Sequence, residues 1–212
     1  TRSDVLRWAY EKPSRYVVEA DYDSEFRYAG RLTLPLFAED GRDRVIYLNT
    51  FSKTMVPSLR IGYMVLPPEL MDAYRDQQGF YSCTVSSFEQ FALAEFIDSG
   101  AFERHMNRMR NFYRKKRKAL LKALRESPLA RRSTIEEYAA GTHFLLRVRT
   151  DLKRTDITQK GERLGLRISF FTDYSICDID MPGQVTLVVN YAAIDPGRID
   201  DVVDRLCQVF EL

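Results

Sequence analysis

The sequence is poor in the residues that build metal centres and disulfide frameworks. It contains 3 cysteines and 2 histidines among 212 residues. Cys83, Cys177 and Cys207 show no paired spacing, and His105 and His143 lie far apart in the chain. Scattered cysteines in an odd number are typical of a reduced intracellular protein. We therefore expect no metal site, free thiols and a cytoplasmic location.

Long apolar runs and a strong charge excess are also lacking. No apolar stretch approaches the roughly 18 residues that indicate a membrane span, so we expect no membrane partner. The formal net charge of +2 is far from the excess typical of a nucleic-acid-binding module. The basic run 114–118 is therefore interpreted as a solvated helix face. The charged opening, which has no methionine, lacks signal-peptide features, and we expect the sequence to start inside a longer protein.

What remains is the composition of an ordinary globular protein, with 45% hydrophobic and 29% charged residues. Residues 3–11 are predicted to form a helix capped by Ser3. A strand is expected at 15–20, and the short apolar runs at 44–50 and 60–67 are typical of strands buried on both faces. This alternation of helix and strand predicts an α/β fold with parallel pairing.

The second half of the chain has a different pattern. A helix is predicted to start at a capping box formed by Ser86 and Glu89 and to end at Gly100. A very long helix is expected over 101–126. Beyond it, the pattern predicts a small α+β domain, with strands near 133–138, 142–149, 166–171 and 184–191 and helices near 155–164 and 196–210. We therefore expect two domains, 1–115 and 116–212, joined by the long helix.

The stretch 50–63, "TFSKTMVPSLRIGY", carries the most specific chemistry. Lys53 lies among small hydroxyl residues directly after a predicted strand, and Arg60 follows seven residues later. A lysine at a fixed point can form a Schiff base with an aldehyde. Hydroxyl groups and an arginine suit phosphate oxygens. Together these groups describe a pyridoxal phosphate (PLP) site, although from the spacing alone a solvated surface lysine is equally compatible.

Three motifs in sequence order carry a family resemblance: "YVVEADYDSEFRYAGR", "YLNTFSKTMVPSLRIGYMVLP" and "EQFALAEFIDSGAFERHMNRMRNFYRKKRKALL". They resemble the aminotransferase-like domain of MocR-type regulators of the GntR superfamily, which pair a winged helix-turn-helix with a fold-type I PLP-dependent domain. The resemblance implies the C-terminal part of such a domain, with a partial large α/β domain and a small α+β domain. The DNA-binding domain, the first strands of the large domain and its glycine-rich phosphate loop are then expected outside this chain.

The resemblance also implies roles for individual residues. Lys53 matches the lysine that forms the aldimine with PLP, and Arg60 matches the phosphate-binding arginine. Thr50 resembles a further phosphate contact, and Tyr22 matches the tyrosine that hydrogen-bonds the phenolic oxygen of the cofactor. Arg167 is the candidate for gripping a ligand carboxylate, because a carboxylate favours a bidentate cation; the competing interpretation is a surface arginine on a strand.

This chain departs from the family at one position. The family pattern before the tyrosine is an acidic run, whereas this chain has Ala20 between Glu19 and Asp21. Alternation along a strand places Ala20 on the face of Tyr22 and the two carboxylates on the opposite face. The carboxylate that would hold the pyridine nitrogen protonated is therefore expected to be missing, which weakens the ring as an electron sink. Asp21 could replace it only if the end of the strand is irregular.

Three functions remain open. The first is an effector-sensing domain of a transcriptional regulator, in which an amine or amino-acid ligand displaces the lysine from PLP. The second is a true PLP-dependent aminotransferase acting on an amino acid, and the third is a cofactor-free dimerisation domain. The resemblance implies a homodimer, DNA contact only through the winged helix-turn-helix, and weak or no PLP binding and turnover in this chain alone. We interpret His105 as structural and His143 as packed within a strand.

Overall fold

The computed structural model describes residues 1–21, 25–26, 34–55, 58–137, 141–175 and 182–212. The chain forms two compact units. The first comprises Thr1–Glu25 and Ala29–Met109, and the second comprises Phe26–Tyr28 and Arg110–Leu212. The boundary between the units lies inside one long helix, between residues 109 and 110, whereas the predicted domain boundary lies between residues 115 and 116.

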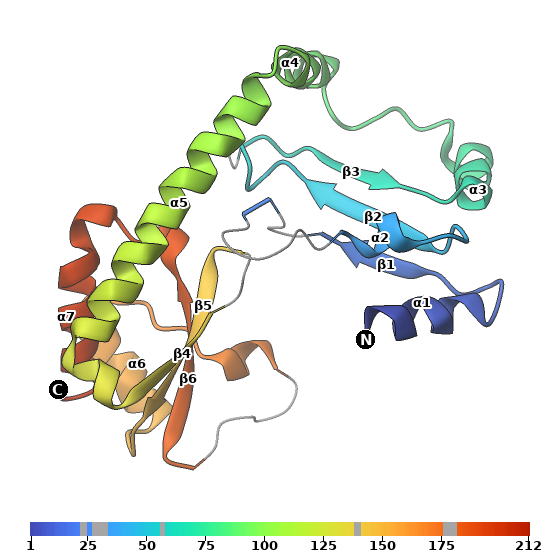
Figure 1. Cartoon of the computed structure of the whole chain (residues 1–212). Coiled ribbons are helices and arrows are strands. Elements are labelled where there is room, and N and C mark those ends of the chain that lie inside the picture. Colours follow the sequence, from blue (N-terminus) through green and yellow to red (C-terminus); the bar gives the residue numbers. More distant parts are fainter. Residues whose placement is uncertain (22–24, 27–33, 56–57, 138–140, 176–181) are drawn as a thin grey trace. The chain divides into compact units, whose positions relative to one another are not determined.

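The first unit contains a three-stranded mixed sheet in the order β1-β2-β3 (Figure 1). Strands β1 and β2 pair in parallel, and β2 and β3 pair antiparallel. The expectation of parallel pairing is therefore correct for the first pair and wrong for the second. The elements of this unit are α1 (Arg2–Tyr10), β1 (Val17–Ala20), α2 (Leu36–Glu39), β2 (Val45–Thr50), β3 (Gly62–Val65), α3 (Pro68–Gln78), α4 (Ser87–Asp98) and the beginning of α5 (Ala101–Glu126).

The second unit contains an antiparallel sheet in the order β4-β5-β6. Its helices bury apolar side chains against this sheet, among them Leu120 of α5, Ile157 of α6 and Val203 of α7. This is the α+β arrangement that the sequence predicts. Besides the end of α5, its elements are η1 (Pro128–Arg131), β4 (Ser133–Glu136), β5 (His143–Arg149), α6 (Arg154–Arg163), η2 (Phe171–Tyr174), β6 (Gln184–Asn190), η3 (Tyr191–Ala193), η4 (Pro196–Arg198) and α7 (Ile199–Val209).

The starts of two helices differ from the predicted caps. Helix α1 begins one residue early, because Thr1 rather than Ser3 forms the cap through a reciprocal contact with Asp4. Helix α4 begins after Ser86 as expected, but the Ser86 side chain makes no capping hydrogen bond. The predicted capping box at α4 is therefore wrong. The long helix is confirmed with the expected bounds, Ala101–Glu126.

The strand predicted at 166–171 is not formed. After α6 the backbone N–H of Leu166 donates to the carbonyl of Gly161, 2.8 Å away, so residue 166 still belongs to the helix end. Gly165 adopts a positive φ of 73°, which turns the chain out of the helix. Only Phe170 then forms an isolated bridge, with Leu187 of β6. The helix end takes up Leu166 and η2 begins at Phe171, so the predicted strand is reduced to the bridge at Phe170.

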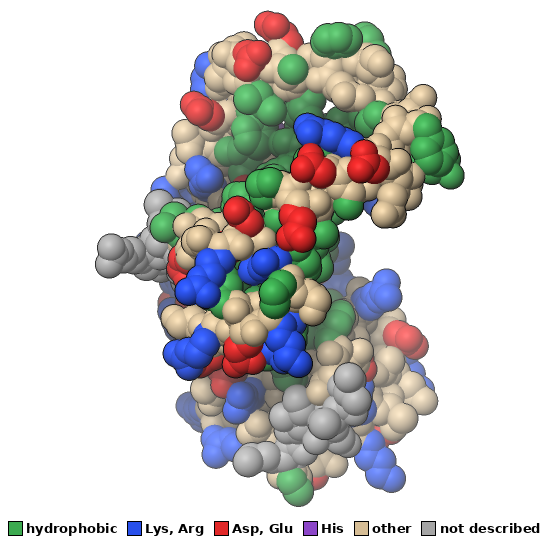
Figure 2. Space-filling model, turned by 90° about the vertical axis from the view of Figure 1, so that its right-hand side faces the viewer, with side chains coloured by type: hydrophobic (Ala, Val, Ile, Leu, Met, Phe, Trp, Pro, Cys, Tyr) green, Lys and Arg blue, Asp and Glu red, His purple; other side chains and the backbone are tan. Residues whose placement is uncertain are grey.

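Burial on both faces is also not observed in the first sheet. Every residue of β3 is exposed, and β2 contains one buried residue, Val45. The small core of this unit joins Val45 to Leu6 of α1 and Leu36 of α2, on one face of the sheet. Figure 2 shows hydrophobic side chains at the surface of one face of the molecule. Among the large hydrophobic residues described in this unit, the largest exposed fractions belong to Phe88 (81%), Phe91 (76%) and Phe80 (75%).

The core of the second unit should be sensitive to cavity formation. Leu146 of β5 is fully buried, so Leu146→Ala is expected to lower the free energy of unfolding by about 2–5 kcal/mol. Its neighbour Arg147 makes an exposed ion pair with Glu136, and Arg147→Ala is expected to cost less than about 1 kcal/mol. Urea denaturation of both variants provides the measurement. Equal losses in the two variants would contradict the assignment of this core.

Candidate functional site

Three of the predicted site residues, Thr50, Lys53 and Arg60, belong to one edge of the first sheet. Because β1 and β2 are parallel, their carboxyl ends, Ala20 and Thr50, lie at the same edge. Thr50 pairs with Gly62 at the start of β3, so the connection that carries Lys53 and Arg60 leaves and re-enters the sheet at this edge. The carboxyl ends of strands in α/β sheets are the usual location of ligand sites.

The backbone around Lys53 forms a closed turn. The N–H of Met55 donates to the carbonyl of Phe51 across the turn, 2.9 Å away. The N–H of Phe51 donates to the carbonyl of Ile61, also 2.9 Å away, and this bond closes the base of the connection. Thr54 is almost completely buried, with 1% of its surface exposed. Lys53 therefore lies in a turn whose backbone is fixed on both sides.

The side chains proposed to contact a cofactor are accessible. Thr50, Lys53 and Arg60 are all exposed. Gly62 allows the close approach of β2 at this point, since a Cβ there would lie 3.3 Å from Cγ2 of Thr50. A hydroxyl group, an amine and a guanidinium thus reach solvent from the same edge of the sheet. This set can bind a phosphate and attack an aldehyde.

In the strand before Tyr22, Glu19 and Ala20 lie on opposite faces, as alternation predicts. Tyr22 itself lies outside the described residues. Ala20 is exposed and Glu19 is half-buried. The Glu19 carboxylate accepts from the backbone N–H groups of Leu36 and Phe37, at 2.7 and 2.8 Å. Glu19 therefore anchors the start of α2 and is directed away from the face of Ala20.

Asp21 is engaged with a tyrosine. Its carboxylate accepts a hydrogen bond of 2.7 Å from the hydroxyl of Tyr47. Burial and this carboxylate raise the pKa of the Tyr47 phenol far above its usual value, so Tyr47 remains a donor. Tyr47 also accepts from Asn49, at 3.2 Å. This network holds Asp21 on the face opposite Ala20.

His105 contacts the lysine turn, and the sequence does not predict this contact. Its Nε2 lies 2.8 Å from the backbone carbonyl of Thr54, the residue after Lys53. The two residues are 51 positions apart in the sequence, and no local pattern connects them. The aromatic rings of Phe96 and Phe102 pack beside this contact, and Phe102 also meets Phe51 of the turn.

The remaining candidate residues lie in the second unit. Arg167 is exposed and lines a cavity of about 370 Å³, whose other polar residues include Arg198, Asp195 and Asn190. His143 is exposed at the first residue of β5, so its interpretation as a packed histidine is wrong. By strand alternation His143 shares its face of β5 with Arg147 and Arg149, which are also exposed.

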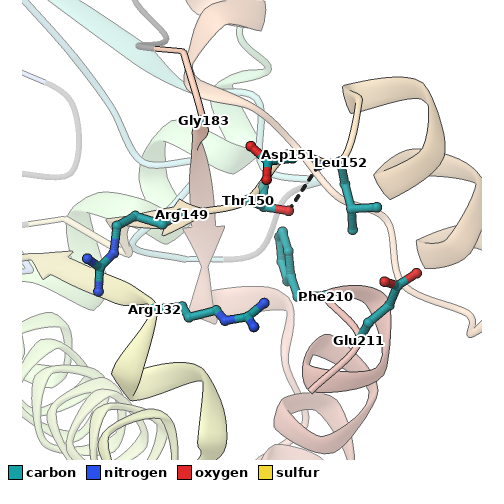
Figure 3. Close-up of a pocket in the computed structure, with 8 residues that line it drawn as sticks. All are labelled: Arg132, Arg149, Thr150, Asp151, Leu152, Gly183, Phe210 and Glu211. Carbon is teal, nitrogen blue, oxygen red and sulfur yellow. Dashed lines mark hydrogen bonds between the residues drawn. The ribbon is translucent and has the colours of Figure 1, made fainter.

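Figure 3 shows a larger cavity of about 640 Å³ in the second unit. Its charged side chains have both signs. Arg132 and Arg149 provide the guanidinium groups, and Asp151 and Glu211 provide the carboxylates. A hydrogen bond from Lys160 lowers the pKa of Glu211, so this carboxylate is already paired. None of the residues that line this cavity is a predicted site residue.

The part of the chain that the structure describes contains no cluster of side chains suited to hold a metal ion. Within the same residues, no helix is both long enough and apolar enough to span a membrane. Cys83 and Cys207 are free thiols, and Cys177 lies outside the described ranges. The chemistry of the site edge therefore rests on the lysine, the arginine and the hydroxyl groups named above.

Residues 18–206 match the family model of aminotransferase class I and II. The chain belongs to this family. The crystal structure of kynurenine aminotransferase from Pyrococcus horikoshii is similar, with a TM-score of 0.79 and 27% identity, over 99% of this chain and 51% of that chain. The predicted fold class, the C-terminal part of a fold-type I aminotransferase, is confirmed by this likeness.

Curated relatives include regulators as well as enzymes. The HTH-type transcriptional regulator YdeL of Bacillus subtilis is 36% identical over 97% of this chain and 43% of its own length. The probable rhizopine catabolism regulatory protein MocR of Rhizobium meliloti is 35% identical over 94% of this chain and 40% of its own length. The resemblance to MocR-type regulators is thus confirmed. The chain spans less than half the length of these two relatives.

Proposed function

We propose that this chain is the C-terminal part of an aminotransferase-like effector-sensing domain in a cytoplasmic transcriptional regulator, and that this domain binds PLP. The observation that carries the proposal is the common position of Thr50, Lys53 and Arg60 at the carboxyl edge of a parallel strand pair. Bound PLP would supply an aldehyde and a phosphate. Lys53 provides the amine for the aldehyde, and Thr50 and Arg60 bind the phosphate oxygens.

The residues fit one side of the cofactor and not the other. The phosphate and aldehyde sides have exposed partners at the sheet edge. Tyr22 is assigned to the phenolic oxygen by family resemblance. At the pyridine nitrogen, Ala20 offers no carboxylate, and Asp21 is bound to Tyr47 on the opposite face. This one-sided fit supports cofactor retention through the lysine and phosphate more than catalytic turnover.

Sensing is favoured over catalysis by two observations. The relatives YdeL and MocR are regulators by name, and this chain has Ala20 where the family has an acidic residue. In the proposed mechanism an amine or amino-acid ligand takes the place of Lys53, and its carboxylate is held by Arg167. The DNA contact is assigned to a winged helix-turn-helix outside this chain.

The proposed domain arrangement follows the family. Residues 1–115 belong to the large PLP-binding domain and 116–212 to the small domain, with α5 joining them. We also propose a homodimer. Phe80, Phe88 and Phe91 are strongly exposed on the first unit and support this proposal, because exposed apolar side chains can be buried in a protein interface.

A spectroscopic titration separates sensing from catalysis. The longer protein that contains this chain is loaded with PLP and then titrated with a panel of amino acids and amines, while the cofactor absorbance and keto acid release are followed. A change that saturates at one equivalent, without continued keto acid release, is expected. Sustained keto acid production would favour a true aminotransferase, to which the similarity with the Pyrococcus horikoshii enzyme points. A protein that stays colourless with PLP would identify a cofactor-free dimerisation domain.

A further inference from the structure

The carbonyl of Thr54 receives a hydrogen bond from outside its own turn. His105 lies in the first part of α5, and its Nε2 is 2.8 Å from this oxygen. Thr54 is 1% exposed, so water has little access to the residue. A buried carbonyl needs a partner from the protein, and His105 supplies it.

The chemistry of the two groups decides which one donates. A carbonyl oxygen can only accept, so Nε2 of His105 must carry the hydrogen. The neutral tautomer with hydrogen on Nε2 and the imidazolium both satisfy this requirement. The contact with Thr54 therefore persists in either protonation state of the histidine.

Three further bonds described for the turn are local to its own connection. Met55 donates to Phe51 across the turn, and Phe51 donates to Ile61 at its base. Thr54 adds a bond of 3.3 Å from its hydroxyl to the Phe51 carbonyl. These bonds fix the shape of the turn, whereas the His105 contact fixes where the turn lies relative to α5.

We infer that His105 is a positioning residue for Lys53. The inference rests on the proposed role of Lys53 as the amine that bonds PLP. His105 holds the peptide carbonyl one residue after Lys53, and the contact of Phe51 with Phe102, with ring centroids 5.9 Å apart, supports the same turn from α5. A lysine must meet an aldehyde at a defined place, and a displaced backbone reduces the rate of reaction.

The geometric part of the inference is tested on the cofactor-free chain by hydrogen–deuterium exchange. His105→Phe keeps a ring and removes the donor, while His105→Gln restores an N–H donor near the position of Nε2. Exchange of the peptide 51–55 is expected to accelerate about fivefold to tenfold in His105→Phe. His105→Gln should return it to within about twofold, and Arg108→Gln on the same helix should leave it unchanged.

The peptide covering β2 is the internal reference. Its exchange is expected to stay constant in all three variants, because the sheet does not depend on the His105 contact. Unchanged exchange of 51–55 in His105→Phe would overturn the inference. Acceleration throughout the first unit, or failure of His105→Gln to restore protection, would show a general structural role and would overturn it as well.

The functional part is tested in the longer protein, which is mixed cofactor-free with PLP and quenched with borohydride at successive times. The rate of adduct formation at Lys53 is expected to fall about tenfold in His105→Phe and to recover in His105→Gln. If the unaltered protein forms no adduct at Lys53, the proposed function fails while the exchange result for His105 stands. If it forms the adduct and His105→Phe matches it in rate, the positioning role fails and the proposed function stands.

Discussion

Lys53→Ala is expected to abolish covalent attachment of PLP to the longer protein that contains this chain. Bound PLP would supply an aldehyde, with which the amine of Lys53 would condense with loss of water. Borohydride would then fix the adduct by adding hydride to the carbon of the C=N bond. Alanine has no nitrogen that can react. Peptide mass spectrometry of the reduced protein should find the adduct at Lys53 and nowhere else in this chain.

The control substitutions separate charge from nucleophilicity. Lys53→Arg keeps a positive charge at the turn but cannot form this bond at neutral pH, because the guanidinium does not lose its proton. We expect both Lys53→Ala and Lys53→Arg to lose the adduct, and Lys53→Arg to keep its affinity for the phosphate of PLP. Adduct on Lys12 or Lys160 of the unaltered protein would overturn the site assignment.

Lys116 is an alternative candidate for covalent attachment of PLP. Burial lowers the pKa of its ammonium group, and a neutral amine is the reactive form. However, Lys116 is 5% exposed and donates to the carbonyl of Ala192, 2.8 Å away. We therefore expect no adduct there. Lys116→Met should leave trapping at Lys53 unchanged, which makes it a matched control within the same protein.

The sequence predicts the elements whose signals are local. The apolar spacing predicts a long helix over 101–126, and α5 has these bounds, Ala101–Glu126. The strand runs at 44–50 and 60–67 contain β2 and β3. Because β1 and β2 are parallel, these predictions also place Thr50 and Ala20 at one edge of the sheet. The position of the candidate site thus follows from short-range patterns together with one pairing rule.

The features that the sequence does not predict depend on partners distant in the chain. The contact of His105 with Thr54 joins two segments 51 residues apart. The antiparallel pairing of β3 depends on where the connection after Lys53 returns, and no residue in it signals the direction. Residues 166–171 have the composition of a strand, but the end of α6 takes up Leu166 through the carbonyl of Gly161. In each case tertiary context overrides the local pattern.

The 212-residue chain alone is expected to bind PLP weakly. This second large effect follows from Ala20 and from the part of the site that we expect outside this chain. A fold-type I site requires a phosphate cradle, a group stacked on the ring, a carboxylate at the pyridine nitrogen and the lysine. Under the proposed function, Thr50, Arg60 and Lys53 would supply part of this set at the sheet edge, and Tyr22 is assigned to it by resemblance. We expect the stacking group and the glycine-rich loop to belong to sequence outside this chain.

The loss of PLP affinity caused by the missing carboxylate can be estimated. A charge-assisted hydrogen bond to the pyridinium contributes about 1.5–3 kcal/mol, which corresponds to roughly tenfold or more in affinity. Asp21 does not replace it, because its carboxylate accepts from Tyr47 on the opposite face of β1. Loss of the amide donors of the cradle and of the stacked ring should reduce affinity by at least as much again.

Titration of the 212-residue chain with PLP, followed by absorbance of the bound cofactor, is therefore expected to show weak or no binding and no transaminase turnover.

In the longer protein, Ala20→Asp should tighten PLP binding about tenfold, because it restores the partner of the pyridine nitrogen. Val18→Asp is the matched control, since Val18 shares the exposed face of β1 but lies farther from its carboxyl end. Its substitution adds the same charge and should not improve affinity. Tight stoichiometric binding by the chain alone, or turnover in the longer protein without Ala20→Asp, would show that another residue meets the pyridine nitrogen, and Asp21 would be the first to test.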